Sequence, residues 1–189
     1  FTLMQIQAYK DCALKLEKGL GYEFIKHAAN TAAISRWPES HFDMVRLGIG
    51  LYGVEMGENS LNLEQVSTLK TTVTQIKKLS KNETVGYDRK GILERDSKIA
   101  TVKIGYADGY NRRFGNAVGQ MKINNQFAPT IGNICMDMCM LDITDIHVRE
   151  GDEVIVFPNI GESAKTIGTI PYELLVNIST RVKRVYYYE

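Results

Sequence analysis

Six short segments of the sequence carry side chains that can bind an anion or carry a charge, and three of the six also contain glycine. They are HAANTAA (27–33), VRLGIGLYG (45–53), VGYD (85–88), GYADGY (105–110), CMDM (135–138) and TIPYE (169–173). Taken alone, each is a weak signal. GYADGY by itself is more typical of a glycine-bounded turn after a strand, and CMDM of a buried strand rich in methionine.

Arg46 is the most informative charged residue, because it sits within the apolar run FDMVRLGIGLY (42–52). A charge in such a run is costly to bury unless it is paired. Two interpretations follow from the residues alone. Arg46 either binds a group in a site, or it forms a salt bridge with Asp43 or points to the surface.

Thr31 and the pair Gly48–Ile49 have the chemistry of an anion-binding site. Thr31 follows a strand-like run and precedes an expected helix, so its hydroxyl and the first amides of that helix suit a phosphate. Gly48 and Ile49 follow a second such run, and glycine lets backbone amides approach an anion closely. A plain helix cap is the alternative for Thr31.

The elements that would position these residues change character near residue 55. The first part alternates between helix and strand, as does the end of a βα-repeating domain. Its expected elements are a helix at 2–20, a strand at 22–27, a short helix from about residue 31 that ends before Pro38, and a strand at 42–52. Thr2 and Gln5 fit a capping box at the start of the first helix.

From about residue 66 the patterns favour β-structure. The expected strands are residues 71–76, 98–104, 120–123, 127–131, 153–157 and 181–188. Ala100, Val102 and Ile104 would share one face, and Asn124-Asn125 fits a hairpin turn. One helix is expected at 170–178, with Thr169 as its cap. Several short strands of this kind predict a small barrel or sandwich.

Composition excludes several classes of function. Of the 189 residues, 44% are hydrophobic and 24% are charged, and the net charge is only +1. This balance gives no field that would attract nucleic acid or an anionic membrane, and no stretch approaches the ~20 apolar residues of a membrane span. Three cysteines without a CxxC pair favour reduced thiols in the cytoplasm and argue against a metal site.

The order and spacing of the six segments closely resemble the alanine racemases, and the resemblance covers essentially the whole chain. It implies an α+β protein, in which residues 1–55 are the last βα units of a TIM-like (β/α)8 barrel that holds pyridoxal 5'-phosphate. Residues 56–189 would be the mostly β C-terminal domain. The family forms head-to-tail homodimers that share their active sites. Because its Schiff-base lysine lies on an early barrel strand, we expect this chain to be a fragment that lacks the lysine and is inactive alone.

The resemblance also implies roles for individual residues of the second part. Tyr87 would be one of the two bases that racemisation needs on opposite faces of the substrate, the lysine being the other. Because a free phenol ionises near pH ~10, the assembled site must favour the phenolate. Tyr106 would line the substrate entrance, and Met136 would bind the substrate carboxylate through its backbone, with Asp137 holding that turn. The family usually has Gly or Asn where this chain has Asp88.

Cofactor-binding roles are implied mainly for the first part. Thr31, Gly48, Ile49 and the more distant Tyr172 would bind the cofactor phosphate. Arg46 would donate a hydrogen bond to the pyridine nitrogen and keep it unprotonated, with His27 as its orienting partner. An arginine cannot give up its proton in a protein, so the ring would be a weaker electron sink and transamination would be disfavoured.

The expected activity is the interconversion of L-alanine and D-alanine, which supplies D-alanine for cell-wall peptidoglycan. Two alternatives stay open. A serine or broad-specificity racemase of the same family would share these motifs. A non-catalytic β-barrel dimerisation or interaction module would leave Arg46, Tyr87 and Met136 without a shared cleft.

Overall fold

The computed structural model describes residues 1–54 and 62–187. Its contacts divide the chain into two compact units, Phe1–Ser67 and Thr68–Glu189. The predicted domain boundary after residue 55 lies outside the described residues, so that assignment stays a prediction.

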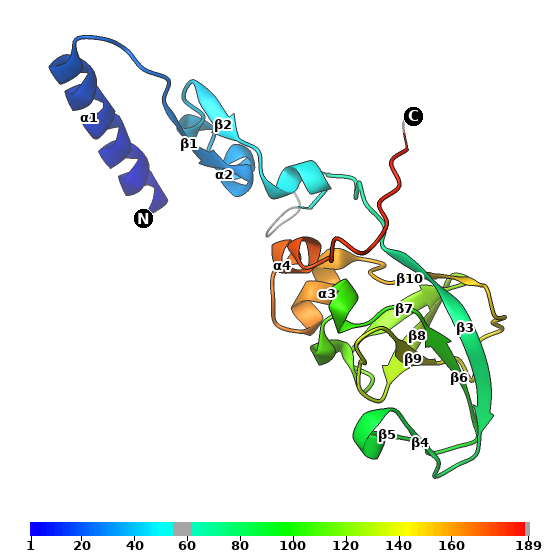
Figure 1. Ribbon diagram of the computed structural model, residues 1–189. Coiled ribbons are helices and arrows are strands. Elements are labelled where there is room, and N and C mark those ends of the chain that lie inside the picture. Colours follow the sequence, from blue (N-terminus) through cyan, green and yellow to red (C-terminus); the bar gives the residue numbers. More distant parts are fainter. Residues whose placement is uncertain (55–61, 188–189) are drawn as a thin grey trace. The chain divides into compact units, whose positions relative to one another are not determined.

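The first unit alternates helix and strand, as expected. Its elements are α1 (Thr2–Leu20), β1 (His27–Asn30), α2 (Thr31–Arg36), β2 (Met44–Arg46) and the 3-10 helices η1 (Pro38–Ser40) and η2 (Ile49–Tyr52). Strands β1 and β2 pair in parallel, with α2 in the connection between them, which is the order of a βα repeat (Figure 1).

Local details of the first unit differ from the expectation. The capping box is wrong, because α1 is capped by Phe1 without a side-chain hydrogen bond and Thr2 is already helical. The strand expected at 22–27 forms only from His27 onward. The strand expected at 42–52 is confined to Met44–Arg46, because the backbone then turns at Gly48 into a 3-10 helix.

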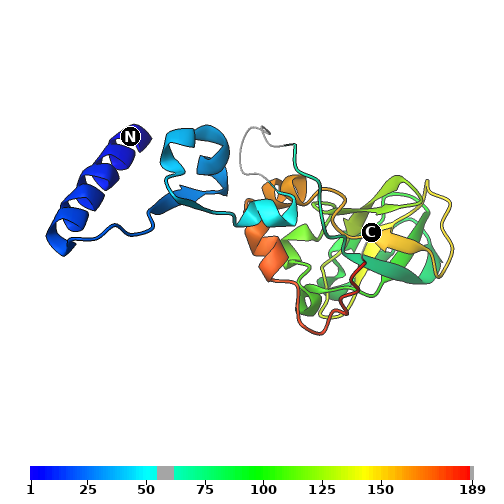
Figure 2. The same cartoon turned by 90° about the horizontal axis from the view of Figure 1, so that it is seen from above.

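The second unit is built on a closed six-stranded antiparallel barrel in the order β10-β3-β6-β9-β8-β7 (Figures 1 and 2). The barrel strands are β3 (Lys70–Leu79), β6 (Ser97–Val102), β7 (Gln120–Ile123), β8 (Gln126–Ile131), β9 (Cys139–Asp142) and β10 (Glu153–Ile155). The remaining elements are a hairpin of β4 (Thr84–Val85) and β5 (Gly91–Ile92), helices α3 (Ile160–Thr166) and α4 (Pro171–Val176), and the 3-10 helices η3 (Tyr87–Arg89), η4 (Tyr106–Asp108) and η5 (Arg112–Phe114). The predicted α+β fold with a mostly β second part is confirmed.

The interior of the barrel follows the expected alternation in part. Ala100 and Val102 are buried on one face of β6, as predicted. Ile104 is also buried but lies beyond the end of β6, and Ile99 on the opposite face is buried too. The hairpin turn is also confirmed, because Asn124 and Asn125 both have the positive φ of a turn that matches strand twist.

The C-terminal part of the second unit was predicted less well. No strand forms over the described residues 181–187. The last helix spans only Pro171–Val176, and its N-cap is Ile170 instead of Thr169. Helix α3, which precedes it, was not anticipated at all. Both helices are only six or seven residues long, which is too short for a clear periodic pattern.

Candidate active site

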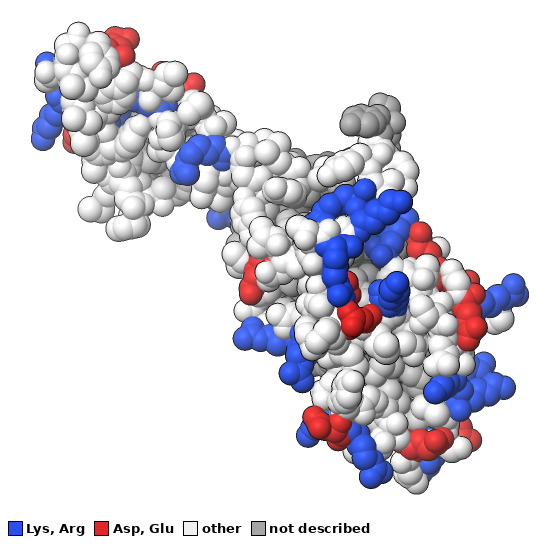
Figure 3. Space-filling view, viewed as in Figure 1, with Lys and Arg blue, Asp and Glu red and all other residues white. Residues whose placement is uncertain are grey.

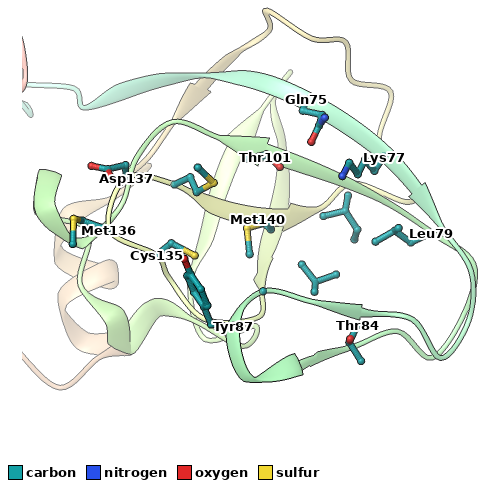
Figure 4. A pocket seen from close by; sticks show the side chains of 14 residues that line it. Gln75, Lys77, Leu79, Thr84, Tyr87, Thr101, Cys135, Met136, Asp137 and Met140 are labelled. Carbon is teal, nitrogen blue, oxygen red and sulfur yellow. The ribbon is translucent and has the colours of Figure 1, made fainter.

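The second unit contains a groove of about 570 Å3 beside the β4–β5 hairpin (Figure 4). Tyr87 and Met136, two of the predicted site residues, both line it. In Figure 4 the Tyr87 ring extends from the hairpin toward Cys135. Leu79 and Met140 add apolar surface to the lining. A groove of this size, mainly apolar with a few polar groups, is typical of a site for a small molecule.

Tyr87 combines an anchored backbone with an exposed ring. Its carbonyl oxygen accepts a hydrogen bond of 3.2 Å from the Asn133 side chain, while the residue as a whole is 73% exposed. The hairpin packs closely on the loop that contains Asn133, because a Cβ at Gly91 would lie 2.8 Å from the amide nitrogen of Gly132. The loop therefore fixes the Tyr87 backbone and leaves the ring exposed beside the groove.

The GYADGY and CMDM segments, thirty residues apart in the sequence, are joined through their backbones. The amide of Tyr106 donates to Cys135 O and that of Ala107 to Met136 O, both at 3.0 Å. A Cβ at Gly105 would lie 2.3 Å from each of these two carbonyl oxygens, so only glycine allows this approach. The structure thus brings Tyr106 and Met136 together, as the predicted site requires.

Arg181 joins the same two segments through its side chain, and the sequence analysis did not single it out. Its Nε donates to Asp108 Oδ1 at 2.7 Å, and its Nη2 donates to Asp137 Oδ1 at 2.5 Å. Hydrogen bonds to Asp108 and then to Asp137 raise the pKa of the guanidinium above its already high value. Asp137 was predicted to hold the Met136 turn, and this ion pair is a means of doing so.

In the first unit, Thr31 and Gly48 also meet as predicted. The buried Thr31 hydroxyl oxygen accepts hydrogen bonds from Gly48 N at 3.0 Å and from Gly50 N at 3.3 Å. Ile49 lies between these two glycines in the sequence and is buried. Thr31 is not the cap of its helix, because the Asn30 side chain takes that role. The plain-cap alternative for Thr31 is therefore wrong.

Arg46 is exposed, and its guanidinium donates to Ala28 O at 3.1 Å. The salt bridge to Asp43 that the sequence left open does not form; Asp43 pairs with Lys26 instead. His27 and Arg46, both described, share no hydrogen bond in the structure. The Ala28 carbonyl, not the His27 ring, holds the arginine side chain.

Tyr172 lies in the first turn of α4, in the second unit, and is half-buried. Thr31, Gly48 and Ile49 lie in the first unit. The predicted role of Tyr172 beside these three residues stays a prediction.

Family comparisons match both units. Residues 66–186 match the model of the alanine racemase C-terminal domain, and residues 1–56 match that of the N-terminal domain. The chain belongs to the alanine racemase family. The segment that includes Tyr87, Tyr106, Met136 and Tyr172 accordingly falls within the family's C-terminal domain.

Curated and solved relatives agree with this family. The chain is 48% identical over 177 residues to alanine racemase 1 of Clostridium acetobutylicum, a match that covers 86% of the chain and 45% of the relative. Alanine racemase of Clostridium difficile 630 superposes with a TM-score of 0.88 at 38% identity, covering 98% of this chain and 50% of that one. The enzyme of Streptomyces lavendulae gives a TM-score of 0.91 at 28% identity, covering 100% and 52%. The chain spans about half the length of the relatives it matches.

The departure from the family pattern at Asp88 has a conformational explanation. Asp88 has φ +59° and ψ +12°, the left-handed region in which glycine and asparagine are most comfortable. Aspartate is also tolerated in this region, so Asp88 fits the turn after Tyr87. Asp88 is exposed. Among the described residues no helix has the length and apolarity of a membrane span.

Proposed function

We propose that the whole protein is an alanine racemase that interconverts L-alanine and D-alanine with pyridoxal 5'-phosphate, and so supplies D-alanine for peptidoglycan. One observation carries the proposal: Tyr87 and Met136, from different loops of the racemase C-terminal domain, line the same groove.

Tyr87 is the proposed acid–base residue. Racemisation removes the α-proton from one face of the substrate carbon and returns a proton to the other, so it needs a group on each face. The phenolic oxygen of Tyr87 takes the proton, or gives it back, on its own face. The lysine that the family carries upstream of these motifs serves the opposite face.

Met136 and Tyr106 are proposed to set the size and orientation of the substrate. The Met136 carbonyl oxygen already accepts the Ala107 amide, so the Met136 amide is the backbone group suited to donate to a substrate carboxylate. Met136 and Tyr106 are both about half exposed, at 54% and 43% of the residue surface, and their side chains can limit the pocket to an alanine-sized side chain.

The first unit fits a cofactor phosphate. Both lone pairs of the Thr31 hydroxyl are taken by backbone amides, which leaves its proton to donate outward to an anion. Thr31, Gly48 and Ile49 would hold the phosphate, and Arg46, supported by Ala28 O and accompanied by His27 on the neighbouring strand, would face the pyridine nitrogen. The phosphate-binding role of Tyr172 rests on the family resemblance alone. When bound, the cofactor withdraws electrons from the α-carbon and so makes its proton removable.

The experiment that tests the proposal is Tyr87→Phe in the whole protein. Racemisation is expected to fall by about 10²–10⁴-fold, the usual contribution of general acid–base catalysis. Exchange of the α-hydrogen of one enantiomer with deuterated solvent should persist, because the opposite base remains. Tyr186→Phe is the matched control, since that tyrosine is 77% exposed and lies outside the groove. Full activity of Tyr87→Phe would refute the assignment.

We further propose a homodimer in the cytoplasm, in which Tyr87 and Met136 complete the active site of the partner subunit. Tyr87 is exposed in this chain, which is consistent with a ring that meets another subunit. A Tyr87→Phe protein mixed with a protein that lacks the lysine should regain activity, because one of the two sites of each heterodimer is intact. The absence of any complementation would rule out shared sites.

A further inference from the structure

Arg181 connects segments that lie far apart in the sequence. It follows α4 and reaches back to two loops that lie 73 and 44 residues earlier in the sequence. Its side chain is 45% exposed, whereas that of Asp108 is only 14% exposed and that of Asp137 is 53% exposed. The guanidinium thus covers the Asp108 carboxylate and links it to the Asp137 carboxylate.

Asp108 is also bonded within its own turn. Its Oδ2 accepts the amide of Gly105 at 2.9 Å, and its carbonyl oxygen accepts the amide of Ser179 at 3.1 Å. The carboxylate that closes the Tyr106 turn is therefore the same one that Arg181 binds. On the other side, Asp137 is the immediate neighbour of Met136.

The segment that carries Arg181 is itself braced. Arg184 donates to the carbonyl oxygens of Ile178, Ser179 and Val182, at 2.8 to 3.0 Å. These bonds fold the segment back on itself just after α4. Figure 3 shows basic atoms gathered beside the C-terminal segment, with acidic atoms among them, on a face where charges are otherwise scattered.

We infer that Arg181 is a positioning residue for the substrate pocket, which clamps the Tyr106 turn to the Met136 turn through Asp108 and Asp137. The inference rests on the proposed function for its catalytic consequence, but the clamp itself is a property of the fold. An arginine suits this task because its planar fork presents separate donors to two carboxylates, while a lysine offers a single nitrogen. Without the cation, the two carboxylates would repel each other, and only the backbone hydrogen bonds of Tyr106 and Ala107 would hold the two turns together.

The first test measures the turns without using catalysis. Hydrogen exchange of segments 105–110 and 135–138 is followed in the whole protein for wild type, Arg181→Gln and Arg181→Lys. Lys183→Gln is the matched control, because it removes the same charge two residues away, from an exposed side chain outside the clamp. Exchange in both segments should quicken by about tenfold in Arg181→Gln, less in Arg181→Lys, and not at all in Lys183→Gln.

The second test measures selectivity. If the turns only position substrate, Arg181→Gln should raise KM for alanine by about tenfold while kcat changes by less than about threefold. The ratio of serine to alanine turnover should rise as the pocket widens. Adding Asp137→Asn to Arg181→Gln should restore part of the loss, because it removes the repulsion between the carboxylates. If Arg181→Gln does not fold, the same measurements are made on Arg181→Lys and Asp137→Asn, in which smaller changes in hydrogen exchange and KM are expected.

Each result has one meaning. Exchange and kinetics equal to those of Lys183→Gln would overturn the clamp. A wild-type protein that does not racemise alanine, combined with faster exchange in Arg181→Gln, would refute the proposed function and leave the clamp standing.

Discussion

The hydroxyl oxygen of Thr31 lies 3.0 Å from the amide nitrogen of Gly48, which is seventeen residues further along the chain. The same oxygen also accepts a hydrogen bond from the Gly50 amide. The buried Thr31 side chain therefore holds the turn around Ile49 through the amides on both sides of that residue. The beginning of α2 and the beginning of η2 are held together by this single atom.

Thr31→Val should weaken the binding of pyridoxal 5'-phosphate to the whole protein by about tenfold or more, because the hydroxyl that would donate to the phosphate is lost and the two partly buried amides lose their acceptor. Thr31→Ser, which keeps the oxygen, is the matched control and should bind almost as the wild type does. Equilibrium dialysis measures both. If Thr31→Val and the wild type bound pyridoxal 5'-phosphate with equal affinity, the turn would not be part of the phosphate site.

Arg46→Lys should lower racemisation in the whole protein and raise transamination, detected as pyruvate released from alanine. Lysine lacks the planar guanidinium that can bind Ala28 O and a ring nitrogen at the same time. Its ammonium can also lose a proton, so it no longer guarantees an unprotonated ring. Unchanged pyruvate release would mean that Arg46 does not contact the ring.

Tyr110→Phe should leave the protein as stable as before or more stable, by about 1 kcal/mol. Tyr110 is 1% exposed, and its hydroxyl is the buried side-chain group within the described residues that has no hydrogen-bond partner. The ring stacks on Phe114 with centroids 4.7 Å apart, a contact that phenylalanine would keep. Urea unfolding measures the effect, with the exposed Tyr187→Phe as control. A loss above about 1 kcal/mol would reveal a partner for the hydroxyl.

Stability should decline at alkaline pH because of Cys139 and Tyr110. Burial, with a smaller effect of Cys135, raises the pKa of the Cys139 thiol far above its usual 9.0, and burial also raises the pKa of Tyr110 well above 10.0. Both groups therefore hold their protons more tightly in the folded state. Their contribution to the free energy of unfolding is complete below about pH 9. It is lost as the pH rises from the ordinary pKa toward the folded-state pKa, starting at 9.0 for the thiol and at 10.0 for the phenol.

Unfolding free energies measured under reducing conditions from pH 8 to 11 test this. Each group should add about 1.4 kcal/mol per pH unit to the rate at which the free energy of unfolding falls with pH. Cys139→Ala should remove the part that begins near pH 9, whereas Cys12→Ala, at an exposed thiol, should not. An identical decline in Cys139→Ala and wild type would show that the thiol does not ionise on unfolding.

Features encoded by neighbouring residues were predictable. The Asn124-Asn125 hairpin and the alternation in β6 depend on residues a few positions apart, and the structure confirms the hairpin in full and the alternation in part. The capping box failed for an equally local reason. The Phe1 carbonyl already accepts the Gln5 amide, so the helix begins one residue earlier than the box requires.

Features that depend on distant partners were not predictable from local patterns. Strands β4 and β5 have two residues each, too few to show any alternation. Arg181 lies in a segment that resembles a strand, and nothing near it in the sequence points to Asp108 or Asp137. The grouping of Tyr87 with Met136 came from the family resemblance, since forty-nine residues separate them and no pattern in between links them.

The closure of the barrel has a consequence for how such a protein can diverge. Every barrel strand has two neighbours, and the ring is completed by β10 pairing with both β3 and β7. Residues 84–92, 105–115 and 132–138 take no part in that ring. Substitutions in the loops at 84–92 and 132–138 can therefore change the groove that they line without altering the pairing of the barrel strands that carry them.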